Sequence, residues 1–259
     1  MDGFGPASLR KCSETGLFCG QSFPLFQKPP SPGACAMTSS ERSPSPPSPS
    51  GLLIVFEGVD GSGKSTQLRR LSGRLEALSL PHLPTKEPGG TPLGGRLREI
   101  LLDPAVAASP LAQLFLFLSD RSQHRQEVLR PALDRGLIVL SDRLSDATMA
   151  YQAFGAGLSR ELVATLNRVA LEGLCPDLTV LLDLPVEALE ARLSARAEGR
   201  TRFEGLGRDY FDRVRRGYLE IARVHADRTL LLDATLSPAL LEERIAEELV
   251  RRFPGRFGP

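Results

Sequence analysis

Long apolar segments are missing from this sequence of 259 residues. No run approaches the roughly 18 consecutive apolar residues that a membrane-spanning helix requires. The N-terminus also lacks the apolar core of a signal peptide. We therefore expect a soluble, untargeted protein with no membrane partner.

An excess of either charge is missing too. The formal net charge is +1, and residues 1–50 hold four basic and three acidic residues, which leaves 28 of each sign in the other 209. Non-specific binding to nucleic acid depends on surplus Lys and Arg that neutralise phosphates. A neutral domain is therefore a poor nucleic-acid binder, although a local cluster of donors suffices to bind a small anion.

Cysteine is scarce where the sequence looks globular. Cys12, Cys19 and Cys35 lie in the N-terminal segment, and only Cys175, which looks buried, lies beyond it. One cysteine cannot form a disulfide within its domain, which favours the reducing cytoplasm. The spacing of Cys12 and Cys19 is not a standard metal-ligand spacing and no histidine lies nearby, so we expect no metal site there.

The first fifty residues differ in composition from the rest. From Pro29 to Ser50 the sequence is mostly Pro and Ser, which cannot bury enough apolar area to offset the entropy of ordering. We expect a disordered extension over residues 1–50, either a solvated linker or the result of a mis-assigned start with Met37 as the true first residue. A regulatory tail is the less favoured alternative. A globular domain is predicted over residues 51–259.

Short apolar runs alternate with longer helical patterns beyond residue 50. Leu52–Phe56 is a continuous, partly β-branched run, which is typical of a strand buried on both faces of a parallel sheet. Further strands are predicted at 82–86, 137–140, 178–182 and 229–232, and helices at 64–79, 92–102, 110–134, 159–173, 186–197, 208–226 and 238–252. The alternation predicts right-handed βαβ units. The predicted fold class is α/β, with a five-stranded parallel sheet flanked by helices on both faces.

A glycine-rich loop follows the first predicted strand. Residues 58–66 read GVDGSGKST and match G-x-x-x-x-G-K-[ST] between a strand and a helix. The glycines let backbone N–H groups turn towards a phosphate, and the helix that begins near Lys64 adds its dipole. Lys64 can reach the β- and γ-phosphates, and Ser65 can ligate Mg²⁺. The motif predicts a P-loop NTPase fold and a nucleotide site formed by Gly58, Val59, Asp60, Gly61, Ser62, Gly63, Lys64, Ser65 and Thr66.

Two other strand ends carry distinctive motifs. Residues 86–92 read KEPGGTP, with LREILL at 97–102, and residues 141–143 read SDR, with AYQ at 150–152. In this order and spacing they resemble the thymidylate kinase family over residues 51–253. The resemblance implies transfer of the γ-phosphoryl group of ATP to dTMP, giving dTDP for dTTP synthesis and DNA replication. It also implies a homodimer, for which the helix 110–134 or the region 146–173 is a candidate interface.

Two arginines point to a phosphorylated acceptor. Arg98 and Arg143 follow predicted strands at the carboxyl edge of the sheet, where open α/β folds bind ligands. Their forked donors can hold a monophosphate through bidentate bonds, whereas a surface salt bridge is the commoner role of a single arginine. Asp60 and Asp142 are candidates for holding Mg²⁺ through water or for orienting the acceptor.

A base-binding pair is predicted on the helix 110–134. Phe117 and Arg121 are four residues apart and share a helix face, so the ring can stack on a base while the arginine donates to a base carbonyl. The resemblance implies that this base is thymine, with Arg121 at its O4 atom. Phe115 is assigned to the core.

The resemblance implies further contacts with the acceptor. Thr148 and Gln152 are placed beside the thymine ring and Tyr151 against the deoxyribose, where it disfavours a 2′-hydroxyl. Glu87 and Pro88 belong to the substrate-binding motif. Many relatives carry serine where this chain has Ala147. A polar contact with the base is therefore lost here or supplied by another group or by water.

An arginine-rich segment is predicted to form a mobile lid. Arg192, Arg196 and Arg200 precede Glu204, which is a candidate for bonding near the sugar, and Gly199 permits a bend. The transferred phosphoryl group requires positive charge in the transition state. The variable P-loop positions 59–62 carry no basic residue, so the sequence resembles the bacterial, lid-arginine subtype. Arg196 is the first candidate for the catalytic arginine and Arg200 the second, and Arg192 and Arg200 are assigned to the nucleotide.

Two alternatives stay open. One is a deoxynucleoside kinase, or another nucleoside monophosphate kinase, on the same fold. A nucleoside kinase has no need for both Arg98 and Arg143 at an acceptor phosphate. The other alternative is a non-catalytic P-loop sensor, for which we expect slow ATP turnover that dTMP does not stimulate.

Overall fold

Five parallel strands form a single sheet. The computed structural model describes residues 51–194 and 206–257. The strand order is β2-β3-β1-β4-β5, with β1 at Leu52–Glu57, β2 at His82–Lys86, β3 at Ile138–Asp142, β4 at Leu178–Asp183 and β5 at Thr229–Asp233. In the centre, Ile54 is in register with Leu140 of β3 and Leu178 of β4. The predicted parallel α/β fold is confirmed.

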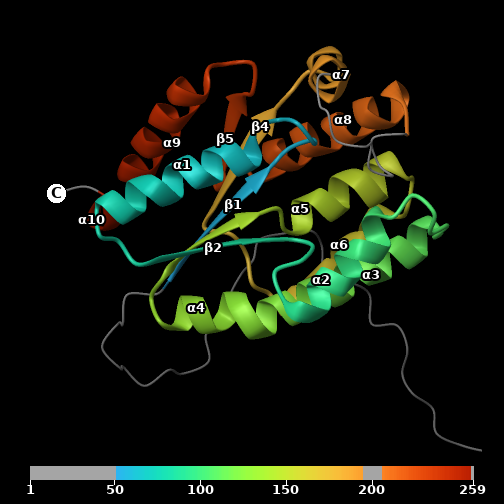
Figure 1. Cartoon of the computed structure of the whole chain (residues 1–259), viewed down its shortest axis with the longest axis horizontal. Coiled ribbons are helices and arrows are strands. Elements are labelled where there is room, and N and C mark those ends of the chain that lie inside the picture. Colours follow the sequence, from blue (N-terminus) through green and yellow to red (C-terminus); the bar gives the residue numbers. More distant parts are fainter. Residues whose placement is uncertain (1–50, 195–205, 258–259) are drawn as a thin grey trace, which may run out of the picture. The chain divides into compact units, whose positions relative to one another are not determined.

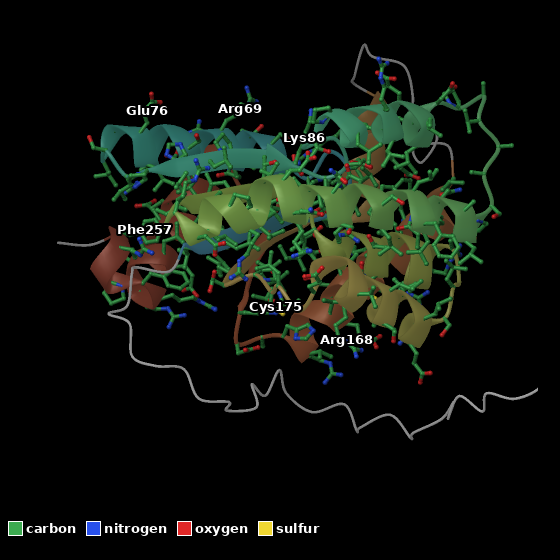
Figure 2. All side chains as sticks on the ribbon, turned by 90° about the horizontal axis from the view of Figure 1, so that it is seen from below. Arg69, Glu76, Lys86, Arg168, Cys175 and Phe257 are labelled. Carbon is green, nitrogen blue, oxygen red and sulfur yellow. The ribbon has the colours of Figure 1, made fainter. Side chains whose placement is uncertain are left out.

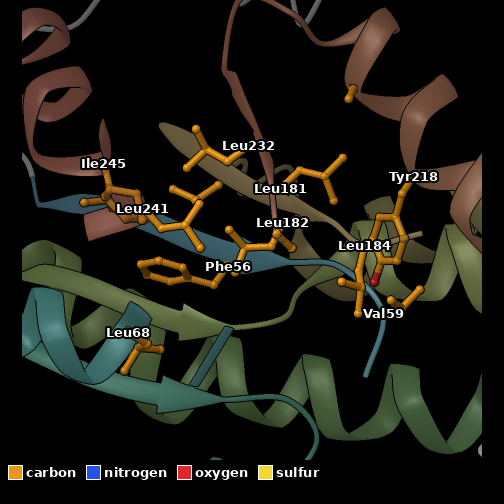
Figure 3. Close-up of a cluster of buried hydrophobic side chains, with 14 of the residues drawn as sticks. Phe56, Val59, Leu68, Leu181, Leu182, Leu184, Tyr218, Leu232, Leu241 and Ile245 are labelled. Carbon is orange, nitrogen blue, oxygen red and sulfur yellow. The ribbon is translucent and has the colours of Figure 1, made fainter. Parts of the chain in front are cut away.

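Helices cover both faces of the central strand, all six residues of which are buried. Ile54 and Phe56 belong to the main core with residues of α1 (Lys64–Ala77) and α9 (Pro238–Arg252), and Figure 3 shows Phe56 near Leu241 and Ile245. Leu53 and Val55 belong to a second core. Burial of each such side chain stabilises the fold by about 1.5–3 kcal/mol, which explains the continuous apolar run.

The second core lies under α4 (Arg130–Asp134) and α6 (Arg160–Leu171), through Ala132 and Leu171. Figure 1 shows α1 and α9 on one side of the sheet and α4 on the other. The helices α7 (Val186–Ser194) and α8 (Arg208–Val224) follow β4, and α10 (Pro254–Phe257) follows α9.

Helix starts follow local sequence signals. The helices α2 (Pro92–Leu102), α3 (Pro110–His124), α6 and α9 each begin after a Ser or Thr whose hydroxyl accepts a backbone N–H from the first turn. Three of them also begin with proline, which loses nothing there because that N–H has no helical partner. The predicted ranges 92–102 and 238–252 are confirmed.

The predicted helix 110–134 is not regular. It consists of α3, a π-helical turn η1 (Arg125–Leu129) and α4. Pro131 has no N–H to donate to the preceding turn, so the regular α-helical ladder cannot pass through it. The helix α5 (Ser145–Thr148) and the π-helical η2 (Met149–Gly155) were not predicted from the sequence, because they lack a clear apolar period.

Two burial predictions are wrong. Cys175 is exposed, in the connection that follows α6 (Figure 2). Phe115 is 52% exposed, because α3 turns this side chain away from the sheet and turns Leu114 and Leu118 inward.

Among the described residues, no helix is both long and apolar enough to cross a lipid bilayer.

Candidate active site

A cavity of about 980 Å³ opens at the carboxyl ends of β1, β2 and β3. Its polar part is formed by the P-loop together with residues at the ends of β2 and β3 or beyond them: Lys86, Glu87, Arg98, Asp142 and Arg143. Its other part is mostly apolar, formed by Ala234, Leu236, Pro238 and Leu241 beside Arg192. This arrangement provides a place for anionic groups and, next to it, a place for a flat apolar ring.

The P-loop has the shape that its glycines predict. Gly58 has φ 136°, and a Cβ there would lie 2.5 Å from the Leu182 carbonyl oxygen, so only glycine fits. Gly63 is left-handed at the N-terminus of α1. The Ser62 hydroxyl is buried and has no hydrogen-bond partner within the described residues. Donors that lack a partner inside this turn suit an anion.

Lys64 is held ready inside the loop. Its ammonium donates to the Val59 carbonyl oxygen at 2.9 Å, and the residue is buried. Burial, with repulsion from Arg143, lowers the pKa of Lys64 to about 8, although Asp60 and Asp142 oppose this shift. A phosphate placed here would restore the favourable environment for the charged amine.

Ser65 and Asp142 meet across the cavity. The Ser65 hydroxyl donates to Asp142 Oδ2 at 2.7 Å, although the residues belong to α1 and β3. Within the described ranges, no group of three or more His, Cys, Asp or Glu side chains forms a dedicated metal cage. Mg²⁺ bound with nucleotides keeps several waters and uses few protein ligands, so a hydroxyl beside a carboxylate fits this ion.

Arg143 occupies the centre of the polar part. Its backbone is left-handed, with φ 76°. Its guanidinium donates to Asp60 Oδ1 at 2.6 Å, to the Gly58 carbonyl oxygen at 3.2 Å and to the Tyr218 hydroxyl at 3.1 Å. Burial alone would raise the pKa of Asp60, but Arg143 and Lys64 outweigh it and lower this pKa to about 2. Asp60 is therefore ionised at neutral pH.

Arg98 lines the same cavity from α2. Its guanidinium donates to the Pro88 carbonyl oxygen at 3.0 Å. Pro88 follows a cis peptide bond in the connection between β2 and α2. The fold thus brings Arg98 and Arg143 to one cavity, although 45 positions separate them in the sequence.

Arg121 forms the centre of a buried polar network and is only 2% exposed. Its Nε donates to Glu87 at 2.8 Å, and Nη1 donates to Thr148 at 2.7 Å and to Asn167 at 2.6 Å. Nη2 donates to the Leu144 carbonyl oxygen at 2.8 Å. Burial would raise the pKa of Glu87, but Arg121 and His124 lower it, so Glu87 is a carboxylate.

The remaining predicted acceptor residues, Tyr151, Gln152 and Phe117, are not among the residues that line the cavity. The Tyr151 hydroxyl donates to Asp60 Oδ2 at 3.3 Å, and the Arg143 guanidinium lies 5.1 Å from the Tyr151 ring centre. Gln152 is buried in η2. Phe117 is half-buried and packs against the main core.

Two residues of the site were missed in the sequence. Glu57 ends β1 fully buried, and its Oε1 accepts the N–H groups of Leu144 and Ala147 while Oε2 accepts the Tyr218 hydroxyl. Burial and the neighbouring Asp146 raise the pKa of Glu57 to about 7, against the opposing effect of Arg143. A glutamate directly after an apolar strand was a visible signal, whereas nothing local marks Tyr218.

The structure describes only the beginning of the predicted lid segment. Arg192, in α7, donates to the carbonyl oxygens of Gly61 and Ala234, both at 2.8 Å. It therefore links the P-loop to the apolar part of the cavity. Arg196, Arg200 and Glu204 lie outside the described residues.

A parallel sheet, a P-loop at the end of its central strand and two arginines across one cavity define a P-loop phosphotransferase. The family model "Thymidylate kinase" matches residues 56–245. The chain belongs to the thymidylate kinase family.

Relatives and a solved structure agree with this assignment. The thymidylate kinase of Trichlorobacter lovleyi is 44% identical over 208 residues, which cover 78% of this chain and 98% of the relative. That of Deinococcus radiodurans is 47% identical over 195 residues, 75% of this chain and 94% of the relative. The crystal structure of thymidylate kinase from Ehrlichia chaffeensis superposes with a TM-score of 0.64 at 29% identity, covering 78% of this chain and 99% of that one.

Proposed function

We propose that this protein transfers the γ-phosphoryl group of ATP to dTMP and releases ADP and dTDP. The observation that carries the proposal is the single cavity that Lys64, Arg98 and Arg143 share. A P-loop accounts for a nucleotide, and two further guanidinium groups account for a second phosphate that faces it. Membership of the family accounts for thymidylate as the acceptor.

ATP is expected to bind along the P-loop. The loop N–H groups surround the phosphates, with Lys64 at the β- and γ-phosphates and Thr66 in the first turn of α1. The adenine ring fits the apolar part of the cavity beside Ala234, Leu236 and Arg192. The partnerless Ser62 hydroxyl gains an acceptor when a phosphate is present.

Ser65 and Asp142 are the residues that would hold Mg²⁺, Asp142 directly or through water. When bound there, Mg²⁺ would neutralise negative charge on the phosphates. The contact between Ser65 and Asp142 supports this assignment, because it joins a hydroxyl and a carboxylate at the mouth of the P-loop.

The acceptor phosphate is assigned to Arg98 and Arg143. Arg98 donates to Pro88 and Arg143 to Asp60, and both guanidinium groups line the cavity that a dianion would enter. An oxygen of the acceptor phosphate then attacks the γ-phosphorus directly, without a covalent enzyme intermediate. Positioning and positive charge provide most of the rate.

Arg121 is assigned to the base. Four of its five N–H groups donate to acceptors among the described residues, which leaves one on Nη2 for a base oxygen. An arginine has no acceptor, so it favours the 4-oxo group of thymine over the 4-amino group of cytosine. Phe117, Thr148 and Gln152 are assigned to the ring, and Glu87 and Pro88 to the loop beside it.

Tyr151 is assigned to the sugar. Its contact with Asp60 places a rigid ring next to the P-loop carboxylate, where it restricts the room for a 2′-hydroxyl. Asp60 counters the charge of Arg143 until the acceptor binds. Glu204 is a further candidate at the sugar, on sequence grounds alone.

The lid-arginine subtype remains part of the proposal. Its support is the absence of a basic residue at positions 59–62, with Arg192 positioned at the base of the segment. Arg196, or else Arg200, then supplies charge to the transferred group. Closure of the lid would keep water from the γ-phosphoryl group.

A homodimer is proposed through the outer face of α2, α3 and α6. These helices lie side by side in Figures 1 and 2, and α3 packs against both α2 and α6. Large apolar side chains are exposed on them: Leu93, Ile100, Leu111, Phe115, Leu162 and Val169. A second copy would bury these side chains, which are unfavourable in water.

Residues 1–50 are proposed to be a disordered extension that the reaction does not require, and residues 51–259 the kinase domain. The reducing cytoplasm remains our inference for the location, because the globular part holds a single cysteine.

One assay tests the function. The full chain is given ATP and Mg²⁺ with dTMP, dUMP, CMP or thymidine, and ADP release is followed. We expect dTMP to be the preferred acceptor. Equal use of thymidine would indicate a nucleoside kinase instead. ATP turnover that dTMP does not stimulate would indicate a sensor.

A further inference from the structure

Two side chains of α3 hold the connection between β2 and α2, and neither lines the cavity. Asp120 Oδ1 accepts the N–H of Gly89 at 3.0 Å. His124 lies between the Glu87 carboxylate, 2.9 Å from Nδ1, and the Thr85 hydroxyl, 2.7 Å from Nε2. Asp120 is 1% exposed and His124 is fully buried. Both therefore act within the protein interior.

The connection and the first turn of α2 lie directly against these side chains. A Cβ on Gly94 would meet Asp120 Oδ1 at 2.2 Å, and a Cβ on Gly90 would meet His124 Cδ2 at 2.5 Å. Neither glycine has a left-handed backbone. Glycine is therefore required at positions 90 and 94 because neighbouring atoms fill the space, including the Lys86 carbonyl oxygen 2.9 Å from the Gly90 position, and not because of conformational freedom. At Gly95, one residue further, no atom of another part of the described chain lies within 4 Å of the Cβ position.

Residues 87–91 contact both arginines that are assigned to dTMP. The Pro88 carbonyl oxygen accepts from Arg98 at 3.0 Å, and the Glu87 carboxylate accepts from Arg121 at 2.8 Å. A shift of this segment would therefore move the assigned phosphate arginine and the assigned base arginine together. The P-loop has no direct bond to Asp120 or His124 among the described residues. The residues assigned to ATP would therefore stay in place.

We propose that Asp120 and His124 are positioning residues of the acceptor site, which clamp residues 87–91 so that Arg98 and Arg121 meet dTMP in fixed places. The inference rests on the proposed function. It adds to the acceptor site two residues that do not touch dTMP and that act by holding residues 87–91. Misplacement of a substrate-binding group by about 1 Å can cost on the order of 10²-fold in rate.

Asp120→Ala removes the acceptor of the Gly89 N–H. We expect KM for dTMP to rise about tenfold while KM for ATP stays within about twofold, because only the acceptor half is released. Asp120→Asn keeps an oxygen acceptor and should stay near the unmodified protein. Equal changes in both KM values, or an Asn variant as impaired as the Ala variant, would overturn the clamp.

Gly94→Ala provides a second test that does not depend on the first. It should raise KM for dTMP by pushing Asp120 away, whereas Gly95→Ala, the matched control, should leave it unchanged. In the Asp120→Ala background, Gly94→Ala should add little, because the nearest remaining atom is the Thr91 hydroxyl oxygen at 3.1 Å. If the increases in KM for dTMP from the two changes multiply in the double variant, the contact between position 94 and Asp120 does not explain the effect of Gly94→Ala.

Hydrogen exchange separates failure of the clamp from failure of the function. The Gly89 amide should exchange faster in Asp120→Ala than in Asp120→Asn, whatever reaction the protein catalyses. Unchanged exchange would overturn the clamp even in an active thymidylate kinase. A protein without dTMP-dependent activity, but with faster exchange, would refute the proposed function and leave the clamp as a structural device of this segment. If Asp120→Ala does not fold, the Asn and Gly94 variants decide the question.

Discussion

The Arg143 guanidinium donates to the Asp60 carboxylate at 2.6 Å, and this bond joins the end of β3 to the P-loop. The same guanidinium reaches the Gly58 carbonyl oxygen and the Tyr218 hydroxyl. Tyr218 donates in turn to Glu57 at 2.9 Å. Arg143 is thus fixed from three directions, which orders its guanidinium and lowers the entropy cost of binding an acceptor phosphate.

Arg143→Lys should lower kcat/KM for dTMP by about 10²–10³. A lysine keeps the charge, but a single ammonium cannot reach all three acceptors that the guanidinium fork spans. Steady-state kinetics with varied dTMP measures the effect. Arg168→Lys, at an exposed position of α6 (Figure 2), is the control and should change nothing. Full activity of Arg143→Lys would contradict the assigned role.

ATP binding should weaken as pH rises above 8. The pKa of Lys64 is lowered to about 8, so at higher pH the free protein loses the charge that meets the phosphates. Calorimetric titration with ATP from pH 7 to 9.5 tests this. Lys64→Ala should bind weakly with no such pH dependence and lose about 10²–10³ in rate. Glu76→Ala, exposed in the same helix, should behave like the unmodified protein.

Arg121→Met should destabilise the fold by about 3–5 kcal/mol, because it leaves the buried Glu87 carboxylate without its arginine. Urea unfolding measures the loss. Adding Glu87→Gln to this variant should recover part of the stability, since the carboxylate that needs the charge is gone. This account would be contradicted if the double variant lost more free energy of unfolding than the two single variants lose together.

Glu57 should make the protein less stable as pH rises from about 5 to 7. Its pKa is about 7 in the fold and 4.5 ordinarily, so the folded state holds a proton that the unfolded chain has lost. The corresponding stability is present below pH 4.5 and is lost by pH 7, an effect of about 3 kcal/mol. Glu57→Gln removes this contribution, whereas those of other shifted groups persist in both proteins, such as Asp120, whose pKa is raised by burial, and His225, whose pKa is lowered by burial. Urea unfolding at several pH values should therefore show a smaller decrease for Glu57→Gln, and identical slopes would refute the shift.

Val169→Glu should convert the proposed homodimer into monomers. Val169 is 69% exposed on α6, and a second copy that covers it would have to bury the new carboxylate. Light scattering after gel filtration measures the mass. Val224→Glu, with Val224 62% exposed at the end of α8, is the matched control and should leave the mass unchanged. A monomeric unmodified protein would refute the interface.

Local patterns were enough to predict much of the fold and the phosphate-binding loop of the site. The apolar runs gave the strands, because a strand buried on both faces needs apolar residues at every position, as in Leu52–Phe56. The P-loop could be located because its geometry depends on glycines and on neighbours in the sequence. Serine and threonine caps with a following proline marked helix starts for the same reason.

Contacts between distant residues were decided only by the tertiary structure. Which way Phe115 and Phe117 face depends on how α3 packs, since both fit the same local pattern. Glu57 and Tyr218 are separated by 161 positions, and the partners of Arg121 lie 23 to 46 positions away. Their bonds exist because the parallel strands bring Glu57, Glu87 and Leu144 to one edge of the sheet, and the packing of α3 and α8 brings Arg121 and Tyr218 to them. The sequence by itself therefore determined a parallel α/β domain with a phosphate-binding loop, and only packing decided which charged side chains are buried together and so hold the acceptor residues in place.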